Sequence, residues 1–155
     1  MAEEWDLPLF ANIAESEQTH MDSVKDLLDR YGLATPTEDV AGVFANAELQ
    51  ALYTELVAQG NLSELEAIKV GAAIEEIDIL DLQERLAQAD QADIQQVFNA
   101  LLNGSYNHLN SFAANYANLS GSVYVPQYMS QAEYDTIASS TTFGGQGGGR
   151  GGRRR

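Results

Sequence analysis

The stretch FANIAESEQTHM, residues 10–21, lies within a helical pattern that extends from about Pro8 to Tyr31. Apolar side chains recur there every three or four residues, which indicates one buried face of an α-helix. Two polar residues, Glu17 and His20, fall on that same face, near the middle of the predicted helix. The members of this face are Phe10, Ile13, Glu17, His20, Val24, Leu27 and Tyr31.

Two more long helices are predicted by the same spacing, over residues 63–89 and from Asp90 or Asp93 to about Leu119. The first begins with a capping box at residues 63–66, and the link between the two is short, so we expect them to pack antiparallel. Their apolar faces are interrupted in the same way as the first helix. The interrupting residues are Glu75 and Asp78 in one helix and Ser105 and His108 in the other.

The remaining segments are shorter. Residues 33–62 form a long connection that contains a predicted short helix at 47–59, with Leu49, Leu52, Tyr53, Leu56 and Val57 facing inward. Residues 123–129 are predicted to be an extended strap over the helices, followed by a brief helix at 131–139 that a second capping box begins. Residues 144–155 are rich in Gly and Arg and are expected to be disordered. The sequence therefore predicts an all-α domain at 1–143 and a tail at 144–155.

The charge of the chain restricts its partners. The 155 residues include 8 Lys and Arg against 23 Asp and Glu, and residues 1–143 alone carry a net charge of −19. An acidic body of this kind has no electrostatic attraction for nucleic acids or anionic membranes, although the Arg-rich tail could contact RNA as a weaker alternative. No signal peptide or membrane-spanning segment is evident, so a cytoplasmic location is expected.

The polar residues on the apolar faces are the candidates for chemistry. A carboxylate buried without a partner is costly, and a bound cation removes that cost. The chain has no cysteine and only two histidines, so a metal site would use oxygen and imidazole ligands. The candidate ligands are Glu17, His20, Glu75, Asp78 and His108. Other acids, namely Glu15, Asp22, Glu64, Glu76, Asp81 and Glu84, lie mostly off these faces and are expected to be solvated.

Other catalytic patterns are lacking. Ser105 and His108 are close on one helix, but the sequence around them is not the strand-to-helix turn that holds a nucleophilic serine in hydrolases. The glycines of the tail have no flanking strand and helix to form a phosphate-binding loop.

Three strings resemble helices of the ferritin-like superfamily of the rubrerythrin type, and together with a fourth they resemble, more narrowly, an uncharacterised bacterial and archaeal family of ferritin-like domains. The strings are residues 10–21, 74–82, 103–109 and 126–134, within a likeness that covers residues 7–137. The resemblance implies a ferritin-like helical bundle whose long connection crosses over between the superfamily's second and third helices. It also implies a di-iron or di-manganese carboxylate centre, with zinc a further possibility, that reacts with oxygen or peroxide as in a ferroxidase or peroxidase-like enzyme.

The resemblance assigns roles to individual residues. Glu17 corresponds to a bridging carboxylate, His20 to a ligand, Glu75 to the third-helix carboxylate and His108 to the second histidine. Asp78 corresponds to an extra ligand or to a residue beside the ligands.

Two departures from the superfamily pattern lead to further expectations. No counterpart of the superfamily's first helix and its Glu ligand precedes Asp6, and Ser105 stands where a fourth-helix Glu would be. A mononuclear site is within reach of the remaining ligands. We expect an apolar groove, covered by a second copy of the chain in a homo-oligomer, by the short helix, or by a further segment. The alternative hypothesis is a degenerate bundle that serves as a structural or protein-interaction module, in which these polar residues only bond to each other.

Overall fold

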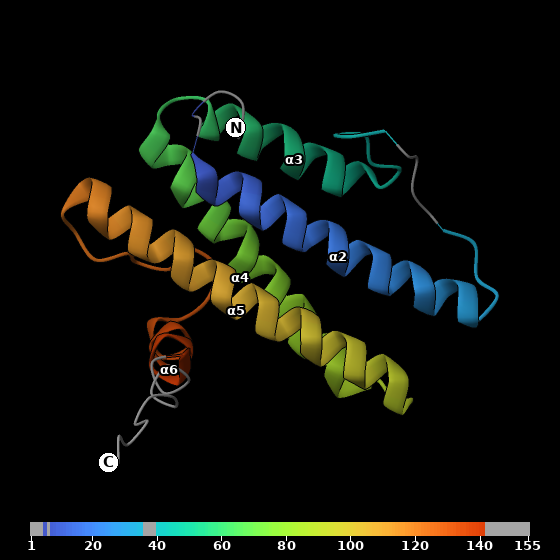
Figure 1. Ribbon diagram of the computed structural model, residues 1–155. Coiled ribbons are helices and arrows are strands. Elements are labelled where there is room, and N and C mark those ends of the chain that lie inside the picture. Colours follow the sequence, from blue (N-terminus) through green and yellow to red (C-terminus); the bar gives the residue numbers. More distant parts are fainter. Residues whose placement is uncertain (1–4, 6, 36–39, 142–155) are drawn as a thin grey trace, which may run out of the picture.

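The computed structural model describes residues 5, 7–35 and 40–141, and within these ranges it contains five helices and no strand. The helices are α2 (Pro8–Arg30), α3 (Ala47–Gly60), α4 (Glu64–Gln88), α5 (Ala92–Ser120) and α6 (Gln131–Thr141). Figure 1 shows α2, α4 and α5 as long helices lying alongside one another, with α6 at one side of α5. The all-helical prediction is thus confirmed for these residues. The predicted tail lies outside them.

Helix α2 begins and ends close to the predicted limits. Leu7 is its N-cap residue and provides no side-chain hydrogen bond, while Pro8 fits the first turn because that turn needs no backbone donor. The predicted cap, Asp6, lies outside the described residues. The helix ends where Gly32 adopts a φ of 66°, a left-handed conformation that suits glycine.

Helices α4 and α5 form the centre of the structure and pack antiparallel over most of their length, as predicted (Figure 1). Ser63 caps α4 by accepting a hydrogen bond from the amide of Glu66 at 3.1 Å. Gly71 allows a close approach between the two helices, because a Cβ atom there would lie only 2.8 Å from Cδ1 of Phe112. Ile68, Ile79, Leu109 and Phe112 are buried around this contact.

Helix α3 packs against α4, but its inward face is narrower than predicted. Leu56 is buried, whereas Leu49 is 51% exposed and Tyr53 is 40% exposed, so the prediction for these two residues was wrong. The ring of Tyr53 instead contacts Phe44, with ring centroids 5.5 Å apart. A single neighbouring helix can bury only one side of α3, which explains why its flanks remain in solvent.

The strap, residues 123–129, is held on α4 by Glu76. The Glu76 carboxylate accepts a hydrogen bond from the hydroxyl of Tyr124 at 2.6 Å. It also accepts hydrogen bonds from the backbone amides of Tyr128 and Met129 at 2.6 and 3.0 Å. The amide of Gln127 also donates to it, at 2.9 Å. Glu76 is completely buried, so the expectation that it is solvated was wrong. Its burial is tolerated because several donors satisfy both oxygens.

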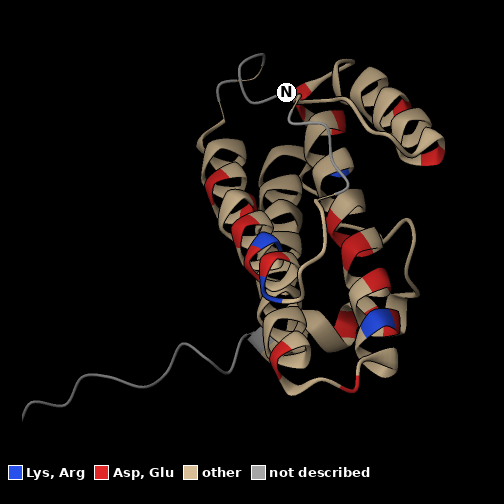
Figure 2. Cartoon of the chain, turned by 90° about the vertical axis from the view of Figure 1, so that its right-hand side faces the viewer, with Lys and Arg blue, Asp and Glu red and all other residues tan. Residues whose placement is uncertain are grey.

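Acidic side chains lie on several of the helices and basic ones are few, as Figure 2 shows. No helix within the described ranges is both long and apolar enough to cross a bilayer.

Candidate metal centre

Three of the predicted ligands, from three different helices, meet in the interior. Nδ1 of His108 on α5 lies 2.8 Å from Oε1 of Glu17 on α2 and 3.4 Å from Oε1 of Glu75 on α4. One ligand atom from each residue can be chosen so that all three lie within 4.8 Å of one another. Glu75 and His108 are buried, with exposed fractions of 3% and 8%. This triad of Glu17, Glu75 and His108 is the candidate metal centre.

The triad atoms are close together without being hydrogen bonded. Oε1 of Glu17, Oε2 of Glu75 and Nδ1 of His108 are each buried and lack a hydrogen-bond partner. The 2.8 Å approach of Nδ1 to Glu17 is therefore not aligned as a hydrogen bond. Buried polar atoms without partners are uncommon in native proteins. Because one ligand atom from each of these residues lies within 4.8 Å of the other two, the three residues together have the chemistry of a ligand set.

The second ring nitrogen of His108 has a partner that sequence analysis missed. Nε2 lies 2.9 Å from Oγ of Ser16, the residue next to Glu17 in α2. The only signal in the sequence is that Ser16 directly precedes Glu17, one of the polar residues on the apolar face of this helix. Two consecutive residues of α2 thus contact the two nitrogens of one imidazole.

His20 joins the site through Glu17 and lies outside the triad. Its Nδ1 is 3.1 Å from Oε2 of Glu17, and its ring centroid is 5.7 Å from that of His108. The ring rests directly on the backbone of α5 at Gly104, where an added Cβ would lie 2.6 Å from Nε2 of His20. The absence of a side chain at Gly104 makes room for His20 between α2 and α5.

The other two interrupting residues lie apart from the triad. Asp78, one turn after Glu75 in α4, is exposed and is not among the triad atoms. Ser105 is buried and donates its hydroxyl to the carbonyl of Leu101 in its own helix at 3.3 Å. The structure therefore brings Glu17, Glu75 and His108 together, places His20 beside them and leaves Asp78 at the surface.

Burial and charge shift the pKa values of the triad. Contacts with the carboxylates of Glu17 and Glu75 raise the pKa of His108 to about 9. Burial raises the pKa of Glu75 to about 6, against the opposing effect of His108. Burial also acts to raise the pKa of Glu17, but His108 and His20 outweigh it and hold that pKa below its usual value. Without a cation, a protonated His108 would be the main charge that balances the two carboxylates.

A groove leads from the surface to the site. It has a volume of about 680 Å³ and runs along α2, with Met21, Val24, Leu28 and Leu101 as its apolar lining. Glu17 and His20 also line it, so the exposed side of the triad faces the groove. A homo-oligomer that covers the expected apolar groove remains a prediction.

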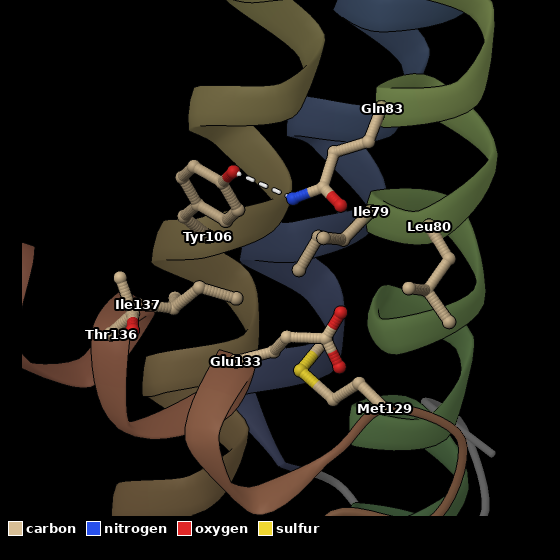
Figure 3. Close-up of a pocket in the computed structure, with 8 residues that line it drawn as sticks. All are labelled: Ile79, Leu80, Gln83, Tyr106, Met129, Glu133, Thr136 and Ile137. Atoms are coloured by element: carbon tan, nitrogen blue, oxygen red, sulfur yellow. Dashed lines mark hydrogen bonds between the residues drawn. The ribbon is translucent and has the colours of Figure 1, made fainter.

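A smaller cavity of about 150 Å³ lies between α4, α5 and α6 (Figure 3). Gln83 donates a hydrogen bond to the hydroxyl of Tyr106 at its edge. Glu133, the one carboxylate among its lining residues, accepts hydrogen bonds from both the amide and the hydroxyl of Ser130. This cavity shares no residue with the triad and brings together no ligand set.

These features define an all-helical protein with a carboxylate and imidazole group buried between three long helices. The chain belongs to the family described as uncharacterized protein domain DUF2202, whose model matches residues 1–141. It is 48% identical over 139 residues to uncharacterized protein MJ0754 of Methanocaldococcus jannaschii, a match that covers 89% of this chain and 75% of the relative. The crystal structure of hypothetical protein MJ0754 has a TM-score of 0.84 to this chain at 47% identity, over 89% of this chain and 79% of that one.

Proposed function

We propose that this protein binds a divalent metal ion through Glu17, Glu75 and His108. The observation that carries the proposal is the set of three buried polar atoms without hydrogen-bond partners, one on each of these residues. A cation bound by one atom of each residue would offset the cost of burying two carboxylates. The donor set of two carboxylates and one imidazole suits iron, manganese or zinc.

We further propose that the metal is iron and that the protein is a member of the ferritin-like superfamily. The resembling strings at residues 10–21, 74–82 and 103–109 support this, and so do the three long helices that each supply one ligand to the triad. Bound iron would supply one-electron chemistry toward oxygen or peroxide. The residues of this chain would hold the ion, keep Glu17 oriented through His20, and admit small reactants along the groove beside α2.

The competing function is a structural or interaction module. The observation in its favour is the charge balance within the triad. His108, with its pKa raised to about 9, would be a cation at neutral pH and could balance the carboxylates without any metal. The two functions differ in the effect of added metal, because removing one partner of a buried ion pair leaves the other charge uncompensated and is destabilising whether or not a metal was ever bound.

Metal analysis of protein purified without chelator is the direct test. The proposal predicts about one iron per chain, and a rise in Tm when Fe(II) is added anaerobically to metal-free protein. Iron, manganese and zinc contents all far below one per chain, together with an unchanged Tm, would contradict it. If iron binds but its oxidation by oxygen or peroxide is no faster than for free Fe(II), metal binding stands and the redox function is lost.

Replacement of both histidines by leucine separates metal binding from a structural role. A metal site predicts that the His20→Leu, His108→Leu double variant loses both bound metal and the metal-dependent rise in Tm. A structural module predicts no bound metal in either protein and a loss of stability in the double variant that chelator does not change, because Glu17 and Glu75 lose their counter-charge. Glu84→Gln is a matched control, because Glu84 is exposed and accepts a hydrogen bond from Gln88 of its own helix at 3.2 Å.

A further inference from the structure

The two nitrogens of His108 have different surroundings. Nδ1 faces the carboxylates of Glu17 and Glu75 and has no hydrogen-bond partner, whereas Nε2 lies 2.9 Å from the hydroxyl oxygen of Ser16. A neutral imidazole carries one N–H, and a metal can bind only the nitrogen that lacks it. The partner of the second nitrogen therefore decides which one is available.

We infer that Ser16 is a positioning residue for the metal centre, one that holds the proton of His108 on Nε2 and leaves Nδ1 for the cation. This inference rests on the proposed metal-binding function. Ser16 Oγ accepts the Nε2–H both when His108 is protonated on both nitrogens and when Nδ1 is free. Only the Nδ1 proton then has to leave when a cation enters.

The position of Ser16 makes it suited to this role. Ser16 and Glu17 are consecutive in α2, so the same turn of helix supplies the hydroxyl for Nε2 and a carboxylate beside Nδ1. The ring of His108 is thus fixed in rotation as well as in protonation. Residues that orient a metal-binding imidazole through its second nitrogen typically change metal affinity 10- to 100-fold when they are removed.

The test compares Ser16→Ala, Ser16→Thr and Ser23→Ala in the full-length chain, with Zn(II) as a diamagnetic probe. Ser16→Ala should bind Zn(II) about 10-fold more weakly or worse, and Ser16→Thr should restore most of the affinity because it keeps the hydroxyl. Ser23→Ala is the control on the same helix, since among the described residues the Ser23 hydroxyl bonds only to the carbonyl of Thr19 at 2.9 Å. Equal Zn(II) affinities of Ser16→Ala and the original chain would overturn the inference.

Nitrogen-15 NMR of the His108 ring gives a readout that does not depend on activity. In the Zn(II) form, Nδ1 should show the shift of a metal-bound nitrogen and Nε2 that of an N–H nitrogen; the reverse pattern would overturn the inference. In the metal-free form, the Nε2–H should exchange slowly with water and should do so faster in Ser16→Ala.

The two proposals fail in different ways. If the original chain binds Zn(II) but Ser16→Ala binds it equally well, the role of Ser16 is lost and the metal site remains. If the original chain binds neither Zn(II) nor Fe(II), the proposed function fails and with it the positioning of a cation. The metal-free spectra would then still show whether Ser16 retains the Nε2–H.

Discussion

Glu75 and Glu76 are consecutive and buried, yet they serve different parts of the molecule. Oε1 of Glu75 lies 3.4 Å from Nδ1 of His108 in the candidate metal centre. Glu76 accepts hydrogen bonds from the hydroxyl of Tyr124 and from three backbone amides of the strap, and these bonds hold that segment on α4. One of these carboxylates is left with an unpaired oxygen and the other is fully bonded. This difference separates a candidate ligand from a structural anchor.

The same substitution at these two positions should have different effects. Glu75→Gln removes a charge from the triad and should abolish or strongly weaken metal binding while the metal-free protein stays folded. Glu76→Gln replaces an acceptor oxygen by an NH₂ group that cannot accept the strap amides, and it should lower the free energy of unfolding by about 1–3 kcal/mol. Metal titration and urea denaturation of both variants would check this, and a Glu76→Gln protein of unchanged stability would contradict it.

Gly104→Ala should disturb His20 without touching the triad directly. The added methyl would lie 2.6 Å from Nε2 of His20, so the ring must move and its contact with Glu17 should be lost. We expect a changed NMR signal for His20 and a metal affinity that is several-fold lower, on the order of the effect of other residues beside the ligands. Asn103→Ala serves as the control, because within the part of the chain that the structure describes the Asn103 side chain bonds only to the carbonyl of Asn99 in its own helix. Unchanged His20 signals would contradict the packing described above.

Gly71→Ala tests the close contact of α4 with α5. The new Cβ would overlap the ring of Phe112, which is itself 2% exposed and has little room to move. Overpacking of this kind typically costs about 1–3 kcal/mol, which exceeds the gain in helix propensity from Gly to Ala of about 1 kcal/mol. The free energy of unfolding should therefore fall. The double variant Gly71→Ala, Phe112→Leu should recover part of the loss, whereas additive losses in the double variant would argue against a direct clash.

The metal-free protein should become less stable as the pH rises from 6.5 to 9. The folded state raises the pKa of His108 from an ordinary 6.5 to about 9, so folding favours the protonated ring. That stabilisation is complete below pH 6.5 and is lost as the pH rises through 9, with a slope of at most about 1.4 kcal/mol per pH unit. Tm measured against pH in the presence of chelator should show the decline, and His108→Leu should remove it. A Tm that stays constant over this range in the original chain would disprove the ion pairing of His108.

Helical periodicity was sufficient to predict most of the fold. The limits of α2, α4 and α5 lie within a few residues of the predicted ones, because each helix has a continuous apolar face and clear signals at its ends. The inward face of α3 was less predictable, since it depends on how many neighbours surround the helix. The burial of Glu76 was not predictable either, because its donors are mainly backbone amides about 50 residues away and leave no pattern in the sequence.

The candidate site was predicted to the extent that it depends on helix faces. Glu17, Glu75 and His108 interrupt apolar faces near the middle of their helices, and a common depth follows from that. Asp78 follows Glu75 by three residues in the same helix, but it is exposed and stays outside the triad, and its role as an extra ligand remains a prediction. Ser16 was missed because a serine beside a face gives no signal until the partner ring on α5 is in place.

The uneven packing of the three long helices has a consequence for the order in which they assemble. Helices α4 and α5 share the largest contact and are joined by a short link, so they can pair early, as a local hairpin. Helix α2 packs mainly on α5 and is separated from α4 by more than thirty residues of chain, so it must close a long loop before it docks. In that order of assembly, the three ligands would come together only when α2 docks. The ability to bind a cation would therefore mark the completion of folding. A bound ion would also slow the local unfolding in which α2 separates from the other helices.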